Sequence, residues 1–181
     1  MSARVLVVAA TKPEAAHVPE GMRLLLTGIG KVEAAGLTAA AIAQERPDVV
    51  VNVGTAGALR PGVAGLYTPS RVVNHDLSAT AIRALGHEAV DEIEVPGGDG
   101  SVLATGDLFV TDPVARDVIA QRAHLVDMEG FAVARAAQLA GVPFRLVKVV
   151  SDSADDSALD WPAAVDACAR ILGDWLLEQH G

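Results

Sequence analysis

The amino-acid sequence predicts a three-layer α/β fold with a central mixed, largely parallel sheet flanked by helices. Two observations predict this class. Apolar residues make up 51% of the chain and aromatic residues only 3%, so the core must consist of Ala, Val, Leu and Ile. Short apolar runs also alternate with Ala-rich stretches, as in parallel strands covered by helices. We expect residues 1–181 to form one domain, because this length suits a single core.

Six apolar runs predict the strands of this sheet, and each ends at residues that favour turns. They cover residues 4–10, 22–26, 48–53, 67–75, 101–105 and 143–150. The first is a continuous run of Val, Leu and Ala, which is typical of a strand buried on both faces. The third leads directly into residues 54–57. There the glycines either let the chain turn sharply or place backbone amides and the Thr55 hydroxyl in a pocket.

Helices are predicted between these strands from their start and stop signals. They cover a segment opened by Pro13, then residues 31–45, 112–122 and 129–140, and an amphipathic segment from Trp161 to Trp175. Asp112 is the expected N-cap of the third helix, with Pro113 at its first position. Gly28 and Gly30 match a dinucleotide fingerprint only in part, so we interpret them as a tight turn into the second helix.

The charge balance excludes several classes of partner. Lys and Arg number 14 against 23 Asp and Glu, which gives a formal net charge of −9. Such a surface repels phosphate backbones and anionic lipids, so we expect no nucleic-acid or membrane binding. No apolar run is long enough to span a bilayer and no signal-peptide pattern is present, which favours a cytoplasmic protein. The single cysteine, Cys168, lies in a helical apolar pattern and is expected to be an inert core residue.

Carboxylates follow several of the predicted strands. Glu129 and Asp152 come after strand-like runs in the last third of the chain, and Glu14 follows the first strand. Open α/β folds bind ligands beyond the carboxyl ends of their strands. Each carboxylate also has a simpler interpretation, as a first-turn or turn-forming side chain. The pair His75-Asp76 indicates structural hydrogen bonding rather than a metal or acid/base site, since zinc spacing and nucleophile motifs are absent from the sequence.

Six sequence segments, taken together and in order, indicate a protein family more specifically than any one of them does alone. In order, the chain carries TKPEA, TGIGKVEAAG, PDVVVNVGTAGAL, ATGDLFV, VDMEGFAVA and VPFRLVKVVSDSADD. This order resembles the nucleoside phosphorylase superfamily, and most closely its hydrolytic branch, the 5'-methylthioadenosine/S-adenosylhomocysteine nucleosidases. The resemblance implies a purine nucleosidase of adenine type that hydrolyses the N-glycosidic bond of a small-molecule nucleoside, with no cofactor and no metal.

The resemblance also implies a role for each matching residue. Glu14 would orient or activate the attacking water, and Glu129 would bind the ribose hydroxyls. Asp152, helped by Ser151, would protonate or hydrogen-bond N7 of the purine. The remaining matches are Thr55 near the water and ribose, Phe109 stacked on the base, Val110 reading the base edge through its backbone, and Met128 beneath the sugar.

A hydrolase and a phosphorylase differ in the cation that a phosphate requires. Phosphorylases of the resembled superfamily carry arginines near the first strand and just before the glycine turn. Here Asn52 precedes Val53, and the first helix holds no arginine. A phosphate buried without a cation is strongly disfavoured, so water is the expected co-substrate. A phosphate-dependent purine nucleoside phosphorylase and a catalytically weak nucleoside-binding protein are the alternatives.

The chain also departs from the resembled family. It is shorter, lacking most of the segment between the first helix and Gly28 and a helix after His75-Asp76. Asp127 and Lys148 stand where glutamate and arginine are usual. Because the missing parts help to cover the ribose, we expect an open pocket, and the 5' substituent is not determined. Relatives are dimers or larger, with a neighbour closing the 5' pocket, so a homodimer or higher homo-oligomer is expected.

Overall fold

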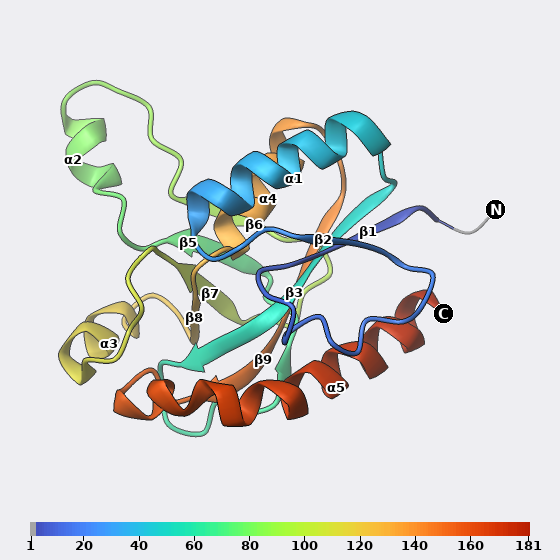
Figure 1. Ribbon diagram of the computed structural model, residues 1–181. Helices are drawn as coiled ribbons and strands as arrows, with labels where there is room; N and C mark the ends of the chain where they lie inside the picture. The colour runs from blue at the N-terminus through green and yellow to red at the C-terminus, as the bar shows by residue number, and fades with distance from the viewer. Residues whose placement is uncertain (1–2) are drawn as a thin grey trace.

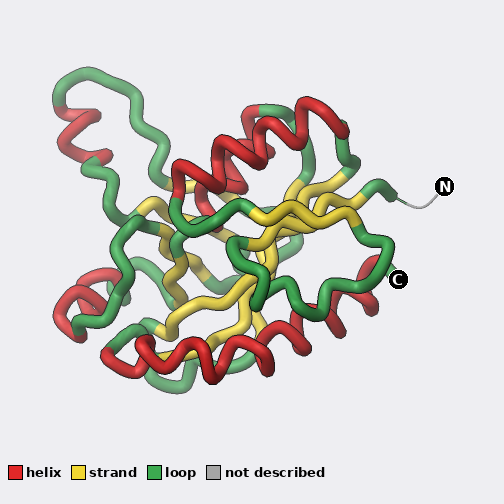
Figure 2. Tube along the Cα trace, viewed as in Figure 1, coloured by secondary structure: helices red, strands yellow, loops and turns green. Residues whose placement is uncertain are grey.

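The computed structural model describes residues 3–181, apart from the side chain of Ser157. Within this range the chain forms an α/β fold in which helices cover both faces of a nine-stranded sheet (Figure 1). Figure 2 shows the same three layers, with red helices above and below the yellow strands. The sheet is mixed but largely parallel, so the predicted fold class is confirmed.

Strand β3 is the centre of the sheet. The strands are β1 (Val5–Ala9), β2 (Arg23–Leu26), β3 (Val49–Ala58), β4 (Leu66–Tyr67), β5 (Arg71–Asn74), β6 (Glu92–Glu94), β7 (Val102–Thr105), β8 (Leu125–Asp127) and β9 (Phe144–Asp152). Neighbours follow the order β2-β1-β3-β8-β7-β5-β6, and β9 pairs with β3 and β4. One side of β3 therefore pairs with β1 and then β8, while its other side pairs with β9.

Two helices cover one face of the sheet and the longest helix covers the other. The helices are α1 (Lys31–Glu45), α2 (Ala79–Ala84), α3 (Pro113–Ile119), α4 (Gly130–Leu139) and α5 (Trp161–His180), with a 3-10 turn η1 (Asp156–Asp160) before α5. Figure 1 shows α1 and α4 above the sheet and α5 below it. Asp112 caps α3 as predicted, accepting from the amides of Val114 and Ala115 (3.2 Å each). Among the described residues, no helix has the length and apolar character needed to cross a membrane.

The continuous apolar run of β1 follows from its position between two cores. Successive side chains of a strand point to opposite faces of the sheet. Leu6 and Val8 pack with side chains from α1 and α4, whereas Val7 packs with side chains from α5. Cys168 belongs to this second core, as the sequence predicts.

The segment after β1 does not form the helix expected at Pro13. Residues 11–17 form successive turns, with one bond of helical type from the Ala15 amide to the Thr11 carbonyl (3.3 Å). The reason lies in Glu14, which folds back so that its carboxylate accepts from the amide and hydroxyl of Thr11. Its side chain therefore points into the protein instead of lying on a solvent-facing helix.

Three other expectations about the elements were wrong. The strand expected to end at Val53 continues through residues 54–57 as the second half of β3, because pairing with β9 continues as far as Asp152. The strand expected at residues 67–75 is divided into β4 and β5, because Pro69 has no amide hydrogen to donate to a ladder. A short helix, α2, follows His75-Asp76, where the sequence indicated none.

Candidate active site

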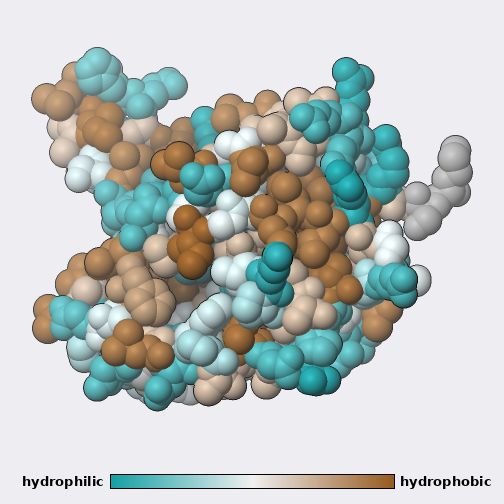
Figure 3. Space-filling model, in the orientation of Figure 1, coloured by the Kyte–Doolittle hydropathy of each residue, from teal (hydrophilic) through white to brown (hydrophobic). Residues whose placement is uncertain are grey.

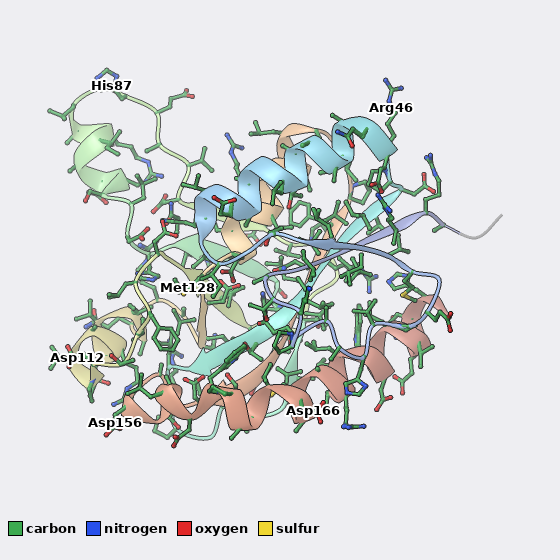
Figure 4. The ribbon with its side chains drawn as sticks, viewed as in Figure 1. Arg46, His87, Asp112, Met128, Asp156 and Asp166 are labelled. Carbon is green, nitrogen blue, oxygen red and sulfur yellow. The ribbon has the colours of Figure 1, made fainter. Side chains whose placement is uncertain are left out.

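A cavity of about 460 Å³ lies at the carboxyl ends of β1, β8 and β9, beside the second half of β3. All eight residues singled out from the sequence line it: Glu14, Thr55, Phe109, Val110, Met128, Glu129, Ser151 and Asp152. Figure 3 shows brown, apolar side chains gathered beside the hollow in the left half of this face. In Figure 4, Met128 lies near the centre of the molecule, below the start of α1. The fold thus brings together residues that are up to 138 positions apart in sequence (152 − 14).

Glu14 is buried and fully hydrogen-bonded within the described structure. Its Oε1 accepts from the amide and the hydroxyl of Thr55 (2.9 Å each). Its Oε2 accepts from the amide (3.1 Å) and the hydroxyl (2.8 Å) of Thr11. A carboxylate offers about four lone-pair sites, so these four donors occupy all of them.

Glu129 precedes α4 and faces the glycine turn before α1. Its Oε1 accepts from the Gly30 amide at 2.8 Å, and Gly30 reaches this position with a φ of 98°, which favours glycine. Burial, reinforced by the negative charges of Asp127 and Glu14, raises the pKa of Glu129 from 4.5 to about 7. Lys148 and the Gly30 amide oppose this shift but do not cancel it.

Behind these carboxylates lies a buried ion pair between Asp127 and Lys148. Their Oδ2 and Nζ atoms are 2.8 Å apart, and the two side chains are 1% and 2% exposed. Asp127 also accepts from the Thr105 hydroxyl (2.6 Å) and the Gly130 amide (2.9 Å). Burial opposes the charge on Lys148, but the neighbouring carboxylates outweigh burial and raise the pKa of its ammonium group. Lys148 therefore supplies the positive charge that lets several acids share one cavity wall.

Asp152 ends β9 on another wall of the cavity. Its Oδ2 accepts from the Ser151 hydroxyl (2.7 Å), and its Oδ1 accepts from the Ala154 amide (2.9 Å). These two bonds fix the carboxyl plane and occupy two of its lone-pair sites. The remaining sites are the ones that a ligand could approach.

Two glycines of β3 make room for these acids. A Cβ on Gly54 would lie 3.1 Å from Glu14 Oε1 and 3.3 Å from Lys148 Nζ. A Cβ on Gly57 would lie 3.0 Å from Asp152 Oδ1. These glycines do not form a sharp turn, which was one of the two alternatives from the sequence, but are places where side chains approach the strand closely. Thr55, which lies between them, lines the cavity, as in the other alternative.

Lys31 joins three of the loops around the cavity. Its ammonium group bonds to Asn74 Oδ1 (3.0 Å) and to Asp76, and its amide donates to Asp107 Oδ1 (2.8 Å). The Asp107 amide in turn donates to Asp76 Oδ2 (2.9 Å). These bonds confirm the structural interpretation for Asp76. The buried Nε2 of His75 has no hydrogen-bond partner among the described residues, so the interpretation of the pair is confirmed only in part. Among the described residues, no group of three or more His, Cys, Asp or Glu is arranged to hold a metal ion.

Four residues that complete the site were given no role from the sequence, although two of them were noted as departures from the resembled family. They are Thr11, Asp127, Lys148 and Trp161. For Lys148 a signal was present, because it is a single charge between apolar residues of a predicted buried strand. A lysine there needs a buried partner. For Trp161, whose indole Nε1 donates to Thr55 Oγ1 (2.9 Å), the sequence carries no signal of a contact across 106 residues.

A model of the Phosphorylase superfamily matches residues 20–96 and 72–172. The chain belongs to this superfamily. Among curated proteins, the 5'-methylthioadenosine/S-adenosylhomocysteine nucleosidase of Anoxybacillus flavithermus is 33% identical over 156 residues, which cover 72% of this chain and 67% of that protein. The nucleosidase of Shewanella halifaxensis is 27% identical over 208 residues and covers 87% and 90% of the two chains. The superfamily assignment made from the sequence blocks is therefore confirmed.

Solved structures of this superfamily share the fold. A Helicobacter pylori nucleosidase mutant with 5'-methylthioadenosine in its active site superposes with a TM-score of 0.87 and 21% identity, covering 98% of both chains. Futalosine hydrolase from the same organism gives a TM-score of 0.85 and 22% identity, covering 97% of this chain and 96% of that one. These superpositions show that the α/β architecture of this chain is shared almost throughout.

Proposed function

We propose that this phosphorylase-superfamily member hydrolyses the N-glycosidic bond of a purine nucleoside, of adenine type, such as 5'-methylthioadenosine or S-adenosylhomocysteine. The observation that supports this proposal most directly is that Glu14, Glu129 and Asp152 line one cavity. Among the described residues that line it, none is Lys, Arg or His. Several acids without a lining cation suit a reaction that develops positive charge on a sugar and consumes neutral water.

In the proposed reaction, the bond between C1' and N9 breaks and its electron pair moves to the purine. Asp152 donates a proton to N7, so the purine leaves as a neutral base. Water adds to C1' as its proton passes to Glu14, and Glu129 accepts hydrogen bonds from the ribose hydroxyls. The products are the free purine and the free sugar, and exchange with solvent returns the two acids to their starting protonation states.

For Glu14 to accept a proton, one of its present donors must move. The Thr55 and Thr11 amides are fixed by the backbone, but the two hydroxyls can rotate. Rotation of one hydroxyl would free a lone pair on Glu14 and offer the hydroxyl oxygen to the incoming water.

The phosphorylase alternative requires a cation for phosphate. Asn52, at the position where phosphorylases carry arginine, donates to the Val8 carbonyl (3.1 Å) inside the sheet and does not line the cavity. Lys148 is held by Asp127 behind the cavity wall. A phosphate dianion in this cavity would face carboxylates, which favours water as the nucleophile.

Release of adenine from 5'-methylthioadenosine, with and without phosphate, tests the proposal. We expect equal rates in both buffers and free methylthioribose as the product. Strict dependence on phosphate, with a sugar phosphate as product, would support the phosphorylase instead. Binding without release would identify a nucleoside-binding protein. A parallel screen of S-adenosylhomocysteine, 5'-deoxyadenosine, adenosine, inosine and futalosine then identifies the 5' group and base.

A further inference from the structure

Trp161, the first residue of α5, is hydrogen-bonded to the threonine that holds Glu14. Its indole Nε1 lies 2.9 Å from Thr55 Oγ1, and Trp161 itself lines the cavity. An indole nitrogen can only donate a hydrogen bond, so the Thr55 oxygen must be the acceptor. The polarity of this contact is therefore fixed.

This polarity determines where the Thr55 proton points. A hydroxyl has one proton and two lone pairs. Since the Trp161 N–H occupies one lone pair of Thr55 Oγ1, the hydroxyl proton is directed to the acceptor on its other side, Glu14 Oε1, at 2.9 Å. The Thr55 amide donates to the same oxygen at 2.9 Å. Both hydrogen bonds on Oε1 thus come from Thr55, and Trp161 holds the hydroxyl in this orientation.

The other hydroxyl on Glu14 has no side-chain donor within the part of the chain that the structure describes. Thr11 Oγ1 donates to Oε2 at 2.8 Å and there receives a long bond from the Glu14 amide, at 3.4 Å. Thr11 is therefore the freer of the two hydroxyls. Trp161 is held in place more firmly, because the helix that carries it, α5, packs against β3 and β9 through Cys168 and Leu172.

We propose that Trp161 is a positioning residue that acts through Thr55 on Glu14, and this inference rests on the proposed hydrolysis. It keeps the Thr55 hydroxyl on Oε1, so that the Thr11 hydroxyl is the one that turns aside when water binds. The start of α5 thereby fixes the side of Glu14 from which water is activated. Loss of the indole N–H lowers the rate of the chemical step without loss of nucleoside affinity.

The test is a double-mutant cycle with a matched control. Trp161→Phe removes the N–H and keeps an aromatic ring in the cavity wall. Trp175→Phe is the control, because Trp175 is the other tryptophan and packs edge-on against His180, away from the cavity. We expect Trp161→Phe to lower kcat about three- to tenfold with KM unchanged. In a Thr55→Ala background the same substitution should change kcat less than about twofold.

Equal losses in both backgrounds, or a rise in KM at constant kcat, would overturn the inference and make Trp161 only a wall of the cavity. The indole N–H signals in ¹H–¹⁵N NMR spectra test the Trp161–Thr55 contact directly. They therefore distinguish failure of this inference from failure of the proposed hydrolysis. The Trp161 signal should exchange slowly and lose that protection in Thr55→Ala, while the Trp175 signal stays the same. A Trp161 signal indifferent to Thr55 overturns the contact whether or not purine is released.

Discussion

The three proposed catalytic acids differ in how the protein solvates them. Among the described residues, Glu14 accepts four hydrogen bonds, Asp152 accepts two, and Glu129 accepts one, from Gly30. The pKa of Glu129 is raised, because burial disfavours its charged form and the negative charges of Asp127 and Glu14 add to the effect. Different surroundings let acids within one cavity take different parts in a single reaction.

Asp152→Asn tests the proposed proton donor. The amide keeps the shape of the side chain but cannot transfer a proton to N7, so kcat for purine release should fall about 10²- to 10⁴-fold. Nucleoside binding, measured by titration calorimetry, should persist within about tenfold. Asp166→Asn is the control, because Asp166 lies on the outer side of α5, bonded to His17 and Arg170 (Figure 4). Unchanged turnover in Asp152→Asn would exclude the role.

The raised pKa of Glu129 predicts that nucleoside binding depends on pH near neutrality. The charged groups that face it are Asp127, Glu14 and Lys148, and its pKa is about 7. If its ionised form accepts the ribose hydroxyls, affinity should fall up to about tenfold per pH unit below 7. Calorimetry with the Asp152→Asn variant measures this without turnover. Glu129→Gln should bind more weakly and with a flat pH profile.

The same group makes a prediction about stability, with the opposite trend. Between pH 4.5 and about 7 the folded state holds the Glu129 proton that the unfolded chain releases. The free energy of unfolding therefore falls as pH rises through this window, by an amount on the order of 3 kcal/mol. Urea titrations at pH 5 and pH 8 should show the decline, and Glu129→Gln should reduce it. An equal decline in both proteins would assign it to other groups.

Among the elements, β3 shows what a local sequence pattern can and cannot predict. Its apolar first half was predicted as a strand, because burial on two faces leaves a continuous apolar run. For its second half the sequence left two interpretations open, a sharp turn permitted by the glycines and a segment that lines a pocket. This segment continues as a strand because it pairs with β9, and its glycines are needed because Glu14 and Asp152 approach it closely. Both contacts come from distant parts of the chain.

Gly57→Ala tests the need for glycine in β3. The added Cβ would lie 3.0 Å from Asp152 Oδ1 and from Ala154 Cβ, so the carboxyl group must shift. We expect kcat to fall about tenfold or more, since small displacements of reacting groups are costly. Gly36→Ala is the matched control, because that position in α1 has no neighbour within 4 Å. It should leave kcat unchanged and raise the free energy of unfolding by about 0.5–1 kcal/mol.

The helices show the same division between local and distant causes. The start of α3 was predicted correctly, because Asp112 bonds to amides within its own first turn. The helix at Pro13 was predicted wrongly, although proline suits a helix start. There the Glu14 carboxylate bonds to Thr11 and also to the distant Thr55 of β3, and these contacts override the local preference.

For the whole molecule, sequence blocks in the correct order identified the fold, the superfamily and eight residues that line one cavity. They did not reveal the supporting network, because that network consists of contacts between distant segments. The Asp127–Lys148 pair joins β8 to β9, and the Trp161–Thr55 bond joins α5 to β3. Such contacts follow from the packing of the complete sheet and not from any local run of residues.

The exposed rim of the cavity predicts self-association of the chain. Four apolar residues both line the cavity and remain largely exposed: Ile29 (60%), Leu108 (53%), Phe109 (49%) and Leu159 (68%). A base stacked on a half-exposed phenylalanine is poorly shielded from water, so a second copy covering this rim would complete the site. We therefore expect light scattering to give at least twice the mass of 18.6 kDa.

Substitutions at two similarly exposed residues, Val32 and Leu85, test which face of the protein self-associates. Val32 (80% exposed) lies in the first turn of α1, three residues after the rim residue Ile29, whereas Leu85 (77% exposed) follows α2 and does not line the cavity. A buried charge in an apolar interface is strongly unfavourable, so Val32→Asp should shift the protein toward a monomer and raise KM, because the rim loses its cover. Leu85→Asp should change neither the mass nor KM. A wild-type monomer at micromolar concentration would contradict the prediction, and a wild-type dimer unaffected by Val32→Asp would place the interface on another face.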